Sequence, residues 1–463
     1  MKTHSFKIDL LFLGAVFVGG YASLALELIV LRNLSSFVGN TSVTASVIIG
    51  TVLLFMALGY YKGSTLSLKK QGVRHLTASG FFKAGIFSFL AATLLVTSFV
   101  FSLFYAFGIY SNVVQAFLFS VLMLSTPSYL FGKITAVISR YFHRSKPNYT
   151  GRILAIDTIG SFLGSILTTL FLMPFIGVHH TVTLLVFLLF VFALLTAKKR
   201  RFFSAGLILL TSLFFNADFF LKEMYSIVVN NAVSTIIATP EDEGKSLLIQ
   251  INGSQSAKCA QDNNLLFPYI RYIEENFIET MPQTTPKEVL ILGAGGFVLG
   301  KSDTYHHYTY VDIEKNLEGI ATSFFKKPLS ANKKFIVEDA NLFLRTTDNK
   351  YDLIVLDIYG SKGMVLMDFV TQEFFTILKK RLNPNAVLVI NIIQNPAKKD
   401  TFSVKIENTL YTVFKENLTK IIPDKFNPWV NTYYNTLYTV INHPLNSSIY
   451  TQNKNPVIWD TVR

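Results

Sequence analysis

The sequence predicts a multi-pass α-helical membrane domain followed by an α/β domain that contains a parallel sheet. Of its 463 residues, 51% are hydrophobic, and the mean hydropathy of +0.40 is too high for an ordinary soluble protein. Long apolar runs fill the first half of the chain. The second half has short apolar runs that each end in glycine or an acidic residue, as buried parallel strands at a ligand site do.

The membrane domain is expected at residues 1–222. Seven apolar runs there approach the roughly 20 residues that a helix needs to cross a bilayer. They lie at about residues 8–31, 42–61, 81–107, 113–138, 153–176, 180–197 and 202–217. Because the first run continues to Leu31 without a convincing cleavage site, we expect a retained anchor and not a signal peptide.

Basic residues in the connections between these runs fall on one side of the predicted membrane. They are Lys2, Lys7, Lys62, Lys69, Lys70, Arg74, Arg140, Arg144, Lys146, Arg152, Lys198, Lys199, Arg200 and Arg201. The positive-inside rule places this side, and the N-terminus, in the cytoplasm. These loops largely account for the net charge of +13, so the charge is not interpreted as a sign of nucleic-acid binding.

Two ionisable residues, Glu27 and Asp157, interrupt the apolar runs, which is typical of a polar pocket or an ion path. The simpler interpretation is that Glu27 pairs with Arg32 near a helix end and that Asp157 hydrogen-bonds a neighbouring helix. Gly160 and Gly164 have the small-x-x-x-small spacing that predicts close helix packing.

Residues 223–285 are expected to form a β-hairpin and a linking helix. The predicted strands are 233–238 and 247–251, joined by a polar turn at 241–245, and the helix is 265–277.

The α/β domain is expected at residues 286–463, and four strand ends define its candidate site. They are the glycine turn Gly293, Ala294, Gly295 and Gly296 after the run 289–292, and the acids Asp312, Asp339 and Asp357 after the next three runs. A turn without bulky side chains lets the backbone approach a ligand, and an acid after the second strand typically binds ribose hydroxyls. Each acid alone could cap a helix instead. All four ends in this order predict one nucleoside site.

Two further strands are expected at 386–393 and 437–442, with a helix at 402–415 between them. Seven strands would complete the sheet.

At these residues the chain resembles the spermidine synthases, or polyamine aminopropyltransferases, which share the Rossmann-like fold of S-adenosylmethionine methyltransferases. The resemblance covers roughly residues 234–444. Residues 12–63 also resemble the membrane half of bacterial spermidine synthase-like proteins. The resemblance implies a transferase of polyamine biosynthesis that moves an aminopropyl group from decarboxylated S-adenosylmethionine to an amine or polyamine acceptor, without a metal.

The resemblance also implies roles for individual residues. Asp357 corresponds to the catalytic aspartate that accepts the proton of the attacking amine. The implied donor-binding residues are Gly293, Ala294, Gly295, Gly296, Asp312, Asp339, Ala340 and Gln255, and the implied substrate-binding residues are Tyr269 and Tyr359.

The chain departs from the family pattern at three places. In the hairpin region, the family's Asp-Glu and Tyr-His elements appear as Asp262-Asn263 with Tyr269, so one acid is lost. Soluble members have a second aspartate after the fourth strand, where this chain has Gly360. The segment 297–308 is also too short for a full helix between the first two strands. Because carboxylates hold cationic polyamines, the missing acid leaves the identity of the acceptor open.

Two alternatives to the aminopropyltransferase remain. One is a methyltransferase that uses intact S-adenosylmethionine, and the other is a transporter or sensor in which the sheet only binds a ligand. The oligomeric state is also open, with a homodimer as one option.

The predicted topology conflicts with the supply of the donor. Seven full crossings from a cytoplasmic N-terminus put the α/β domain outside, where adenosyl donors are not normally supplied. Asn216 and Asp218 shorten the seventh run, so we expect it to lie in the interface. We therefore favour a multi-pass protein of the cell membrane with a cytoplasmic catalytic domain.

Other chemistry has little support in the sequence. Cys259 is the one cysteine, so disulfides within the chain and thiolate metal clusters are excluded. The pairs His179-His180 and His306-His307 lack partners at metal-ligand spacing, and we expect surface or interface residues there.

Overall fold

The computed structural model describes residues 2–39, 41–67, 69–143, 148–197, 202–360, 366–397, 400–423 and 433–442. The chain divides into two compact units, Met1–Ile237 and Ala238–Arg463, and each is described by itself. Arg144, Lys146, the basic run 198–201 and the end of the chain after residue 442 were part of the predictions above but lie outside the described residues.

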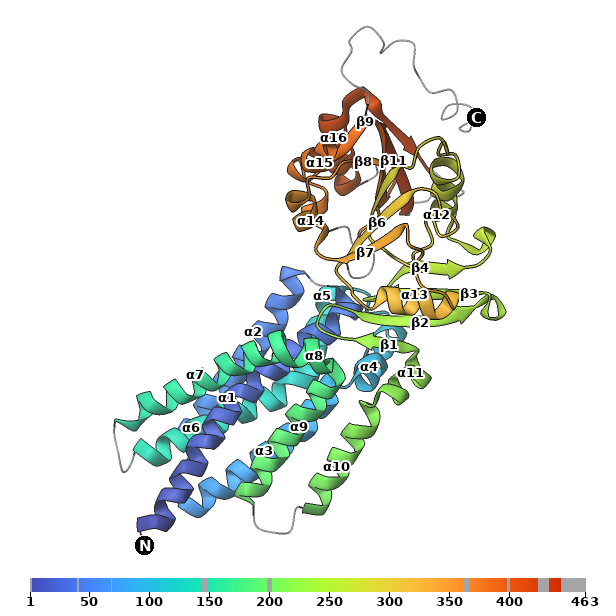
Figure 1. Cartoon of the computed structure of the whole chain (residues 1–463). Coiled ribbons are helices and arrows are strands. Elements are labelled where there is room, and N and C mark those ends of the chain that lie inside the picture. The colour runs from blue at the N-terminus through green and yellow to red at the C-terminus, as the bar shows by residue number, and fades with distance from the viewer. Residues whose placement is uncertain are drawn as a thin grey trace. The chain divides into compact units, whose positions relative to one another are not determined.

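Long helices make up most of the first unit (Figure 1). They are α1 Lys2–Val38, α2 Ser42–Thr65, α3 Lys70–Ala92, α4 Leu94–Ala106, α5 Asn112–Phe119, α6 Ser125–His143, α7 Tyr149–Leu167, α8 Met173–Ile176, α9 Val178–Thr196, α10 Phe202–Phe215 and α11 Asp218–Tyr225. Two π-helical turns, Ser120–Leu124 and Thr168–Leu172, join α5 to α6 and α7 to α8. Pro127 and Pro174 follow these turns, and a proline lacks the N–H that a regular helix would use there.

Five helical stretches of the described chain are long and apolar enough to cross a membrane: Ile8–Val38, Ser42–Thr65, Asn112–His143, Tyr149–Ile176 and Val178–Thr196. Two further pairs pass the same test together but are bent, α3 with α4 by 63° and α10 with α11 by 55°. The number rises to seven if each bent pair is one span. Each of the seven predicted runs falls on one of these segments.

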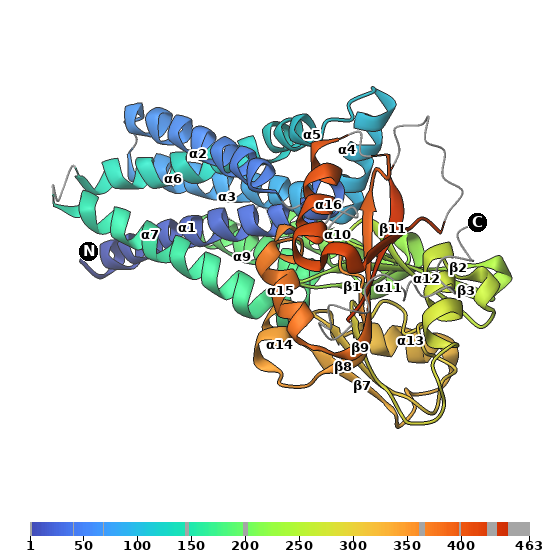
Figure 2. The ribbon, with the colours of Figure 1, turned by 90° about the horizontal axis from the view of Figure 1, so that it is seen from above.

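Glycines allow close contact between helices of the first unit. A Cβ at Gly160 or Gly164 of α7 would overlap the carbonyl oxygens of Phe17 and Tyr21 on α1, and Gly132 of α6 stands in the same way against the backbone of α2. Figures 1 and 2 show α1 beside α7 and α2 beside α6. The close packing predicted from Gly160 and Gly164 is therefore confirmed.

Asp157 of α7 is buried and hydrogen-bonds two neighbouring helices. Tyr60 of α2 donates to its Oδ2 at 3.2 Å, and Thr135 of α6 donates to its Oδ1 at 3.3 Å. The simpler interpretation of Asp157 is thus confirmed. Glu27 is also buried, and its pairing with Arg32 stays a prediction.

Helix ends that carry basic residues are held together by hydrogen bonds. Arg74 at the start of α3 donates to the carbonyl of Thr196 at the end of α9, at 3.0 Å. Arg140 near the end of α6 donates to the carbonyl of Ser64 at the end of α2. The described basic connections therefore gather at one end of the bundle, as the charge pattern predicted.

Helix α10 packs beside α9 in the helical unit. Thr183 near the start of α9 donates to the carbonyl of Ser212 near the end of α10, at 3.5 Å, so the two helices run antiparallel. α10 thus runs along α9, away from the basic ends, and does not lie across the end of the bundle. This stretch passes the length and hydropathy test only as a bent pair with α11, so the placement of residues 202–217 in the interface stays a prediction.

A four-stranded sheet replaces the predicted two-stranded hairpin. Its strands are β1 Ile227–Asn230, β2 Thr235–Glu241, β3 Ser246–Ile251 and β4 Ser254–Ala260, in this spatial order, and the boundary between the two units falls within β2. β1 is antiparallel to β2, and β3 is antiparallel to β4. The sequence SQSAKCA of β4 has none of the large β-branched or aromatic residues typical of strands, so pattern alone did not reveal it.

The second unit contains a sheet of the expected seven strands, one more than the six located in the sequence. They are β5 Glu288–Leu292, β6 His307–Asp312, β7 Lys333–Val337, β8 Tyr351–Leu356, β9 Leu382–Gln394, β10 Leu418–Ile421 and β11 Tyr434–Ile441, in the order β10-β11-β9-β8-β5-β6-β7. Strands β5 to β9 are parallel, and β11 is antiparallel to both of its neighbours. The predicted Rossmann-like methyltransferase fold is confirmed.

Helices cover both faces of this sheet (Figures 1 and 2). α14 Ala340–Thr346, α15 Gln372–Lys380 and α16 Thr401–Phe414 lie on one face, and α12 Pro268–Ile273 and α13 Leu317–Phe325 lie on the other. Phe343, Phe375 and Leu410 bury their side chains against β8 and β9 in the core of the first of these faces. Between β5 and β6 the described chain forms turns, which confirms that this segment has no room for a helix.

Candidate active site

β5 marks the point where the strand order of the parallel sheet reverses, because β6 pairs with one of its edges and β8 with the other. Ligands of open α/β sheets bind at such a point, outside the carboxyl ends of the strands. Gly293 follows β5 with a φ of +95°, which residues with a Cβ rarely adopt. A Cβ at Gly293 would also overlap the carbonyl oxygen of Asp357, which follows β8. The two predicted strand ends therefore meet at the switch point.

The rest of the glycine turn packs against β4. A Cβ at Gly296 would overlap the sulfur of Cys259, and Cys259 Sγ lies 3.5 Å from the carbonyl oxygen of Gly296. A Cβ at Gly295 would stand 3.4 Å from the Cβ of Ala257. Gln255 lies on this same strand, with an exposed side chain. The tertiary structure thus brings the predicted donor-binding strand to the predicted donor-binding turn.

Asp312 ends β6 and connects two loops. Its Oδ2 accepts the N–H of Ala294 and its Oδ1 accepts the N–H of Glu314, both at 3.0 Å. Burial raises the pKa of Asp312, and the backbone hydrogen bonds oppose that effect. Asp312 therefore fixes the glycine turn from the position at which the resemblance implies a ribose contact.

Asp339 is the N-cap residue of α14. Its Oδ1 accepts the N–H of Leu342 at 2.9 Å, and its side chain is exposed, whereas Ala340 is buried. The helix-capping interpretation is thus correct for this acid. The implied contact with adenine stays a prediction.

Asp357 is held by side chains. Tyr269 O–H donates to its Oδ2 at 3.0 Å, and Asn391 Nδ2 donates to its Oδ1 at 2.9 Å. Burial raises the pKa of Asp357 to about 6, although both hydrogen bonds act to lower it. The described residues that follow it are not helical, so Asp357 does not start a helix. Its carboxyl group can change protonation state near neutral pH.

The two predicted substrate tyrosines belong to the surroundings of this acid. Tyr269, on α12, is buried and bonded to Asp357, and Tyr359 follows Asp357 by two residues. Burial raises the pKa of each phenol well above its usual value, and the charge of Asp357 adds to the effect. Both tyrosines therefore remain neutral beside the carboxylate.

Asn391 and Glu274 were missed from the sequence. Asn391 lies in β9, where a polar residue inside the apolar run VLVINII was the available signal. Glu274 is buried, and its Oε2 accepts the N–H of Gly300 at 2.8 Å, which fixes the chain after the glycine turn. Burial raises the pKa of Glu274 to about 7. No local sequence pattern indicated that Glu274 would bind the N–H of Gly300.

Comparison with known proteins agrees with this architecture. Residues 269–442 match the family model described as the spermine/spermidine synthase domain. Over this segment the chain is similar to that family. It contains Tyr269, the glycine turn and all three edge acids, whereas Gln255 precedes it.

Individual relatives are distant. The chain is 23% identical over 275 residues to a polyamine aminopropyltransferase of Oceanobacillus iheyensis, which covers 52% of this chain and 51% of the relative. It is 29% identical over 191 residues to a polyamine aminopropyltransferase of Sulfolobus acidocaldarius, which covers 37% of this chain and 57% of the relative. The chain thus spans about half the length of the curated relatives it matches. A solved structure of a probable spermidine synthase from Corynebacterium glutamicum is similar over 47% of this chain and 80% of that one, at 21% identity and a TM-score of 0.39.

Proposed function

We propose that this chain is a membrane-anchored, spermidine synthase-like aminopropyltransferase. The observation that carries the proposal is Asp357, a carboxyl group with a pKa of about 6 at the switch point of a spermine/spermidine synthase domain. An amine must lose a proton to become a stable product after it attacks, and a carboxylate with this pKa can accept that proton at neutral pH.

The proposed reaction is a displacement at carbon. The amine nitrogen attacks the methylene carbon bonded to the sulfonium of decarboxylated S-adenosylmethionine, the C–S bond breaks, and methylthioadenosine leaves with the electron pair. The nitrogen's proton passes to Asp357. Tyr269 and Asn391 each donate to one oxygen of Asp357, so its orientation is set before the acceptor binds. Alignment of nitrogen and carbon supplies most of the rate.

The glycine turn and Asp312 are the proposed site of the adenosine. The positive φ of Gly293 shapes the turn, and Asp312 holds Ala294 in place while its carboxylate keeps a lone pair for a ribose hydroxyl. Gln255, Asp339 and Ala340 are proposed to complete this site, as the resemblance implies.

The donor carboxylate distinguishes the methyltransferase alternative. Intact S-adenosylmethionine carries this group and needs a partner for it. Lys301, which follows the glycine turn, donates its Nζ–H groups to the carbonyl oxygens of Ala260 at 2.6 Å and Gln261 at 3.0 Å. Because backbone carbonyls engage this ammonium, Lys301 does not offer an unengaged cation for that carboxylate.

The exposed surface of the first unit supports the membrane anchor. Large apolar side chains of its helices stand open to the surroundings, including Leu54, Phe99, Phe162 and Leu210, each at least 58% exposed. Exposed apolar side chains of this size are unfavourable in water and favourable in a lipid bilayer.

A donor-and-acceptor screen tests the function. Purified full-length protein is incubated with either adenosyl donor and a panel of amines and polyamines, and products are identified by mass spectrometry. The proposal predicts aminopropylated amine and methylthioadenosine from the decarboxylated donor alone. Methylated products from the intact donor would favour the methyltransferase. Nucleoside binding without turnover, together with substrate flux in vesicles, would favour the transporter or sensor.

The side of the membrane needs its own test. The proposed donor predicts a cytoplasmic synthase domain, whereas the positive-inside rule combined with the path of α10 favours the opposite side. Glu243 is 90% exposed, so a Glu243→Cys variant offers a reactive thiol. The native chain is the unlabelled control, because burial raises the pKa of its one thiol, Cys259, to about 12. Labelling by an impermeant maleimide only after lysis of spheroplasts is expected. Labelling before lysis would support seven crossings and count against the adenosyl donor.

A further inference from the structure

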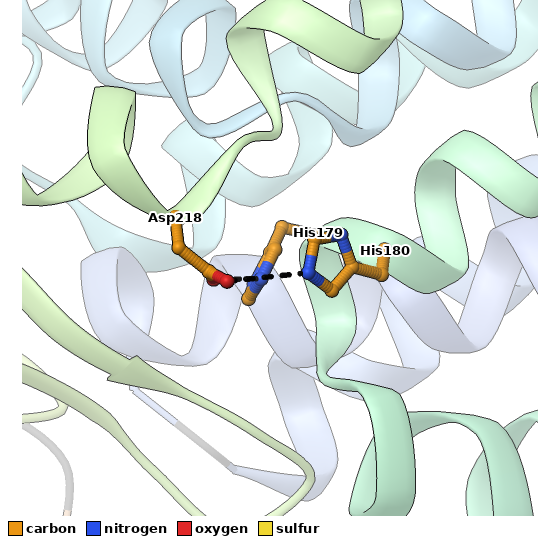
Figure 3. Close-up of side chains that lie close together, drawn as sticks. All are labelled: His179, His180 and Asp218. Atoms are coloured by element: carbon orange, nitrogen blue, oxygen red, sulfur yellow. Dashed lines mark ion pairs between the residues drawn. The ribbon is translucent and has the colours of Figure 1, made fainter.

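Two histidines and an aspartate of the helical unit come together at the start of α9. His179 and His180 stand in the first turn of α9, and Asp218 is the first residue of α11. Figure 3 shows the carboxylate of Asp218 turned toward both imidazole rings. Nε2 of His179 lies 2.7 Å from Oδ1, and Nε2 of His180 lies 3.4 Å from Oδ2. The histidine pair was expected to lack a partner, and the fold supplies one.

The burial of this cluster is uneven. His179 is 8% exposed, yet neither of its buried ring nitrogens has a hydrogen bond of good geometry within the described chain. Its short contact with Asp218 is therefore not aligned as an N–H···O bond. His180 and Asp218 are exposed, with side-chain exposures of 45% and 77%. The cluster thus has one buried imidazole without a well-aligned hydrogen bond and two side chains that are open to solvent.

We infer that His179, His180 and Asp218 bind a divalent first-row transition metal ion, with Zn²⁺ as the probe ion. Their candidate ligand atoms all lie within 4.8 Å of one another. Ligands of a tetrahedral Zn²⁺ stand about 3.3 Å apart when each is roughly 2.0 to 2.1 Å from the metal. Two imidazoles and one carboxylate suit such an ion, and three protein ligands leave one position for water on the exposed side.

The backbone around the cluster orients the ligands. Gly177 starts α9 with a φ of +84°, and a Cβ there would stand 3.0 Å from both the carbonyl oxygen of Asn230 and Cε1 of His179. The hydrogen bond between Thr183 and the carbonyl of Ser212 holds α10 beside α9 one turn further on. A bound ion would therefore connect the start of α11 to the start of α9. This connection would lie at the 55° bend between α10 and α11.

Equilibrium metal binding tests the site. Full-length protein purified in detergent without a histidine tag is stripped with a chelator and titrated with Zn²⁺ against a chromophoric competitor. The variants His180→Ala and Asp218→Asn remove exposed ligands, so neither opens a cavity. His75→Ala removes an exposed histidine of α3 and is the matched control.

The native protein and His75→Ala are expected to bind one Zn²⁺ per chain. His180→Ala and Asp218→Asn are each expected to bind at least about tenfold more weakly, since even partners of metal ligands contribute 10- to 100-fold. Zn²⁺ should raise the melting temperature of the native protein and not of these variants. Co²⁺ should give tetrahedral absorption bands in the native protein. Equal affinity in all four proteins, or no tight Zn²⁺ binding by the native chain, would overturn the inference.

Discussion

Asp339 and Asp357 follow two strands of the same parallel sheet, but the protein holds them in different ways. The carboxylate of Asp339 accepts a backbone N–H at the start of a helix and is exposed. The carboxylate of Asp357 accepts hydrogen bonds from two side chains, Tyr269 and Asn391, and burial raises its pKa to about 6. A carboxylate that caps a helix stabilises the fold in its ionised form, whereas one held by side chains in a buried site can exchange a proton. The same sequence feature, an acid after a strand, thus serves two purposes.

The sharpest test of this difference is Asp357→Asn. The amide can keep hydrogen bonds with Tyr269 and Asn391 but cannot accept the proton of the amine. We expect kcat to fall by roughly 10² or more, the scale of a lost proton acceptor, while the affinity for methylthioadenosine stays within a few fold. Steady-state kinetics and calorimetry on one preparation measure both. A fully active Asp357→Asn would defeat the catalytic assignment.

The control for this variant is Asp352→Asn, at the start of the same strand, whose carboxylate binds Glu288 N–H and Asn383. It should leave kcat nearly unchanged.

Stability gives a second check. Because the folded-state pKa of Asp357 is above its ordinary value of 3.8, its contribution to stability is present below that value and is lost as the pH rises through about 6. Asp357→Asn removes this loss and should not lower the melting temperature at pH 8.

Asp312 is the intermediate case, because backbone N–H groups hold it and the proposal also gives it a ligand. We expect Asp312→Ala to weaken methylthioadenosine binding by about 1.5 to 3 kcal/mol, or roughly 10- to 150-fold, since a charged hydrogen-bond acceptor is lost. Calorimetry measures the change. Asp348→Ala, which removes an exposed acid, is the control. Equal binding by Asp312→Ala and the native protein would refute a ribose contact.

The hydroxyl group of Tyr269 should change the pKa of Asp357. Its hydrogen bond lowers the pKa of Asp357, so Tyr269→Phe should raise that pKa by roughly half to one unit, the equivalent of one hydrogen bond. In the native protein kcat/KM should rise with pH through about 6, because Asp357 loses its proton there. In the variant this acidic limb of the pH profile should move to higher pH. The measurement is kcat/KM from pH 5 to 8. A variant with lower activity but an unmoved limb would show that Tyr269 acts only on packing or on the acceptor.

The smallest effect is expected at Asp339. Asp339→Ala should cost about 1 kcal/mol of folding stability, because the bond to Leu342 N–H at the start of α14 is lost. Asp339→Ser keeps a good N-cap residue and removes the carboxylate, so it should retain the melting temperature. If the implied adenine contact is real, Asp339→Ser should also bind methylthioadenosine several fold more weakly. Unchanged affinity would leave Asp339 with its capping role alone.

The sequence by itself determined the elements and the edge of the sheet that carries the site. Apolar runs near bilayer length became helices, and the runs that end at Gly293, Asp312, Asp339 and Asp357 became neighbouring parallel strands. Such patterns are local, because hydrophobic periodicity and turn residues act within one element. The family motifs were visible for the same reason.

The tertiary structure decided which groups meet. Asp357 is 88 residues from Tyr269 and 34 from Asn391, and these contacts, not its place after a strand, separate it from Asp339. Asp218 reaches His179 and His180 only because α10 returns along α9. Burial and distance between remote residues set pKa values and ligand sets, and both are properties of the packed chain. No spacing in the sequence encodes them.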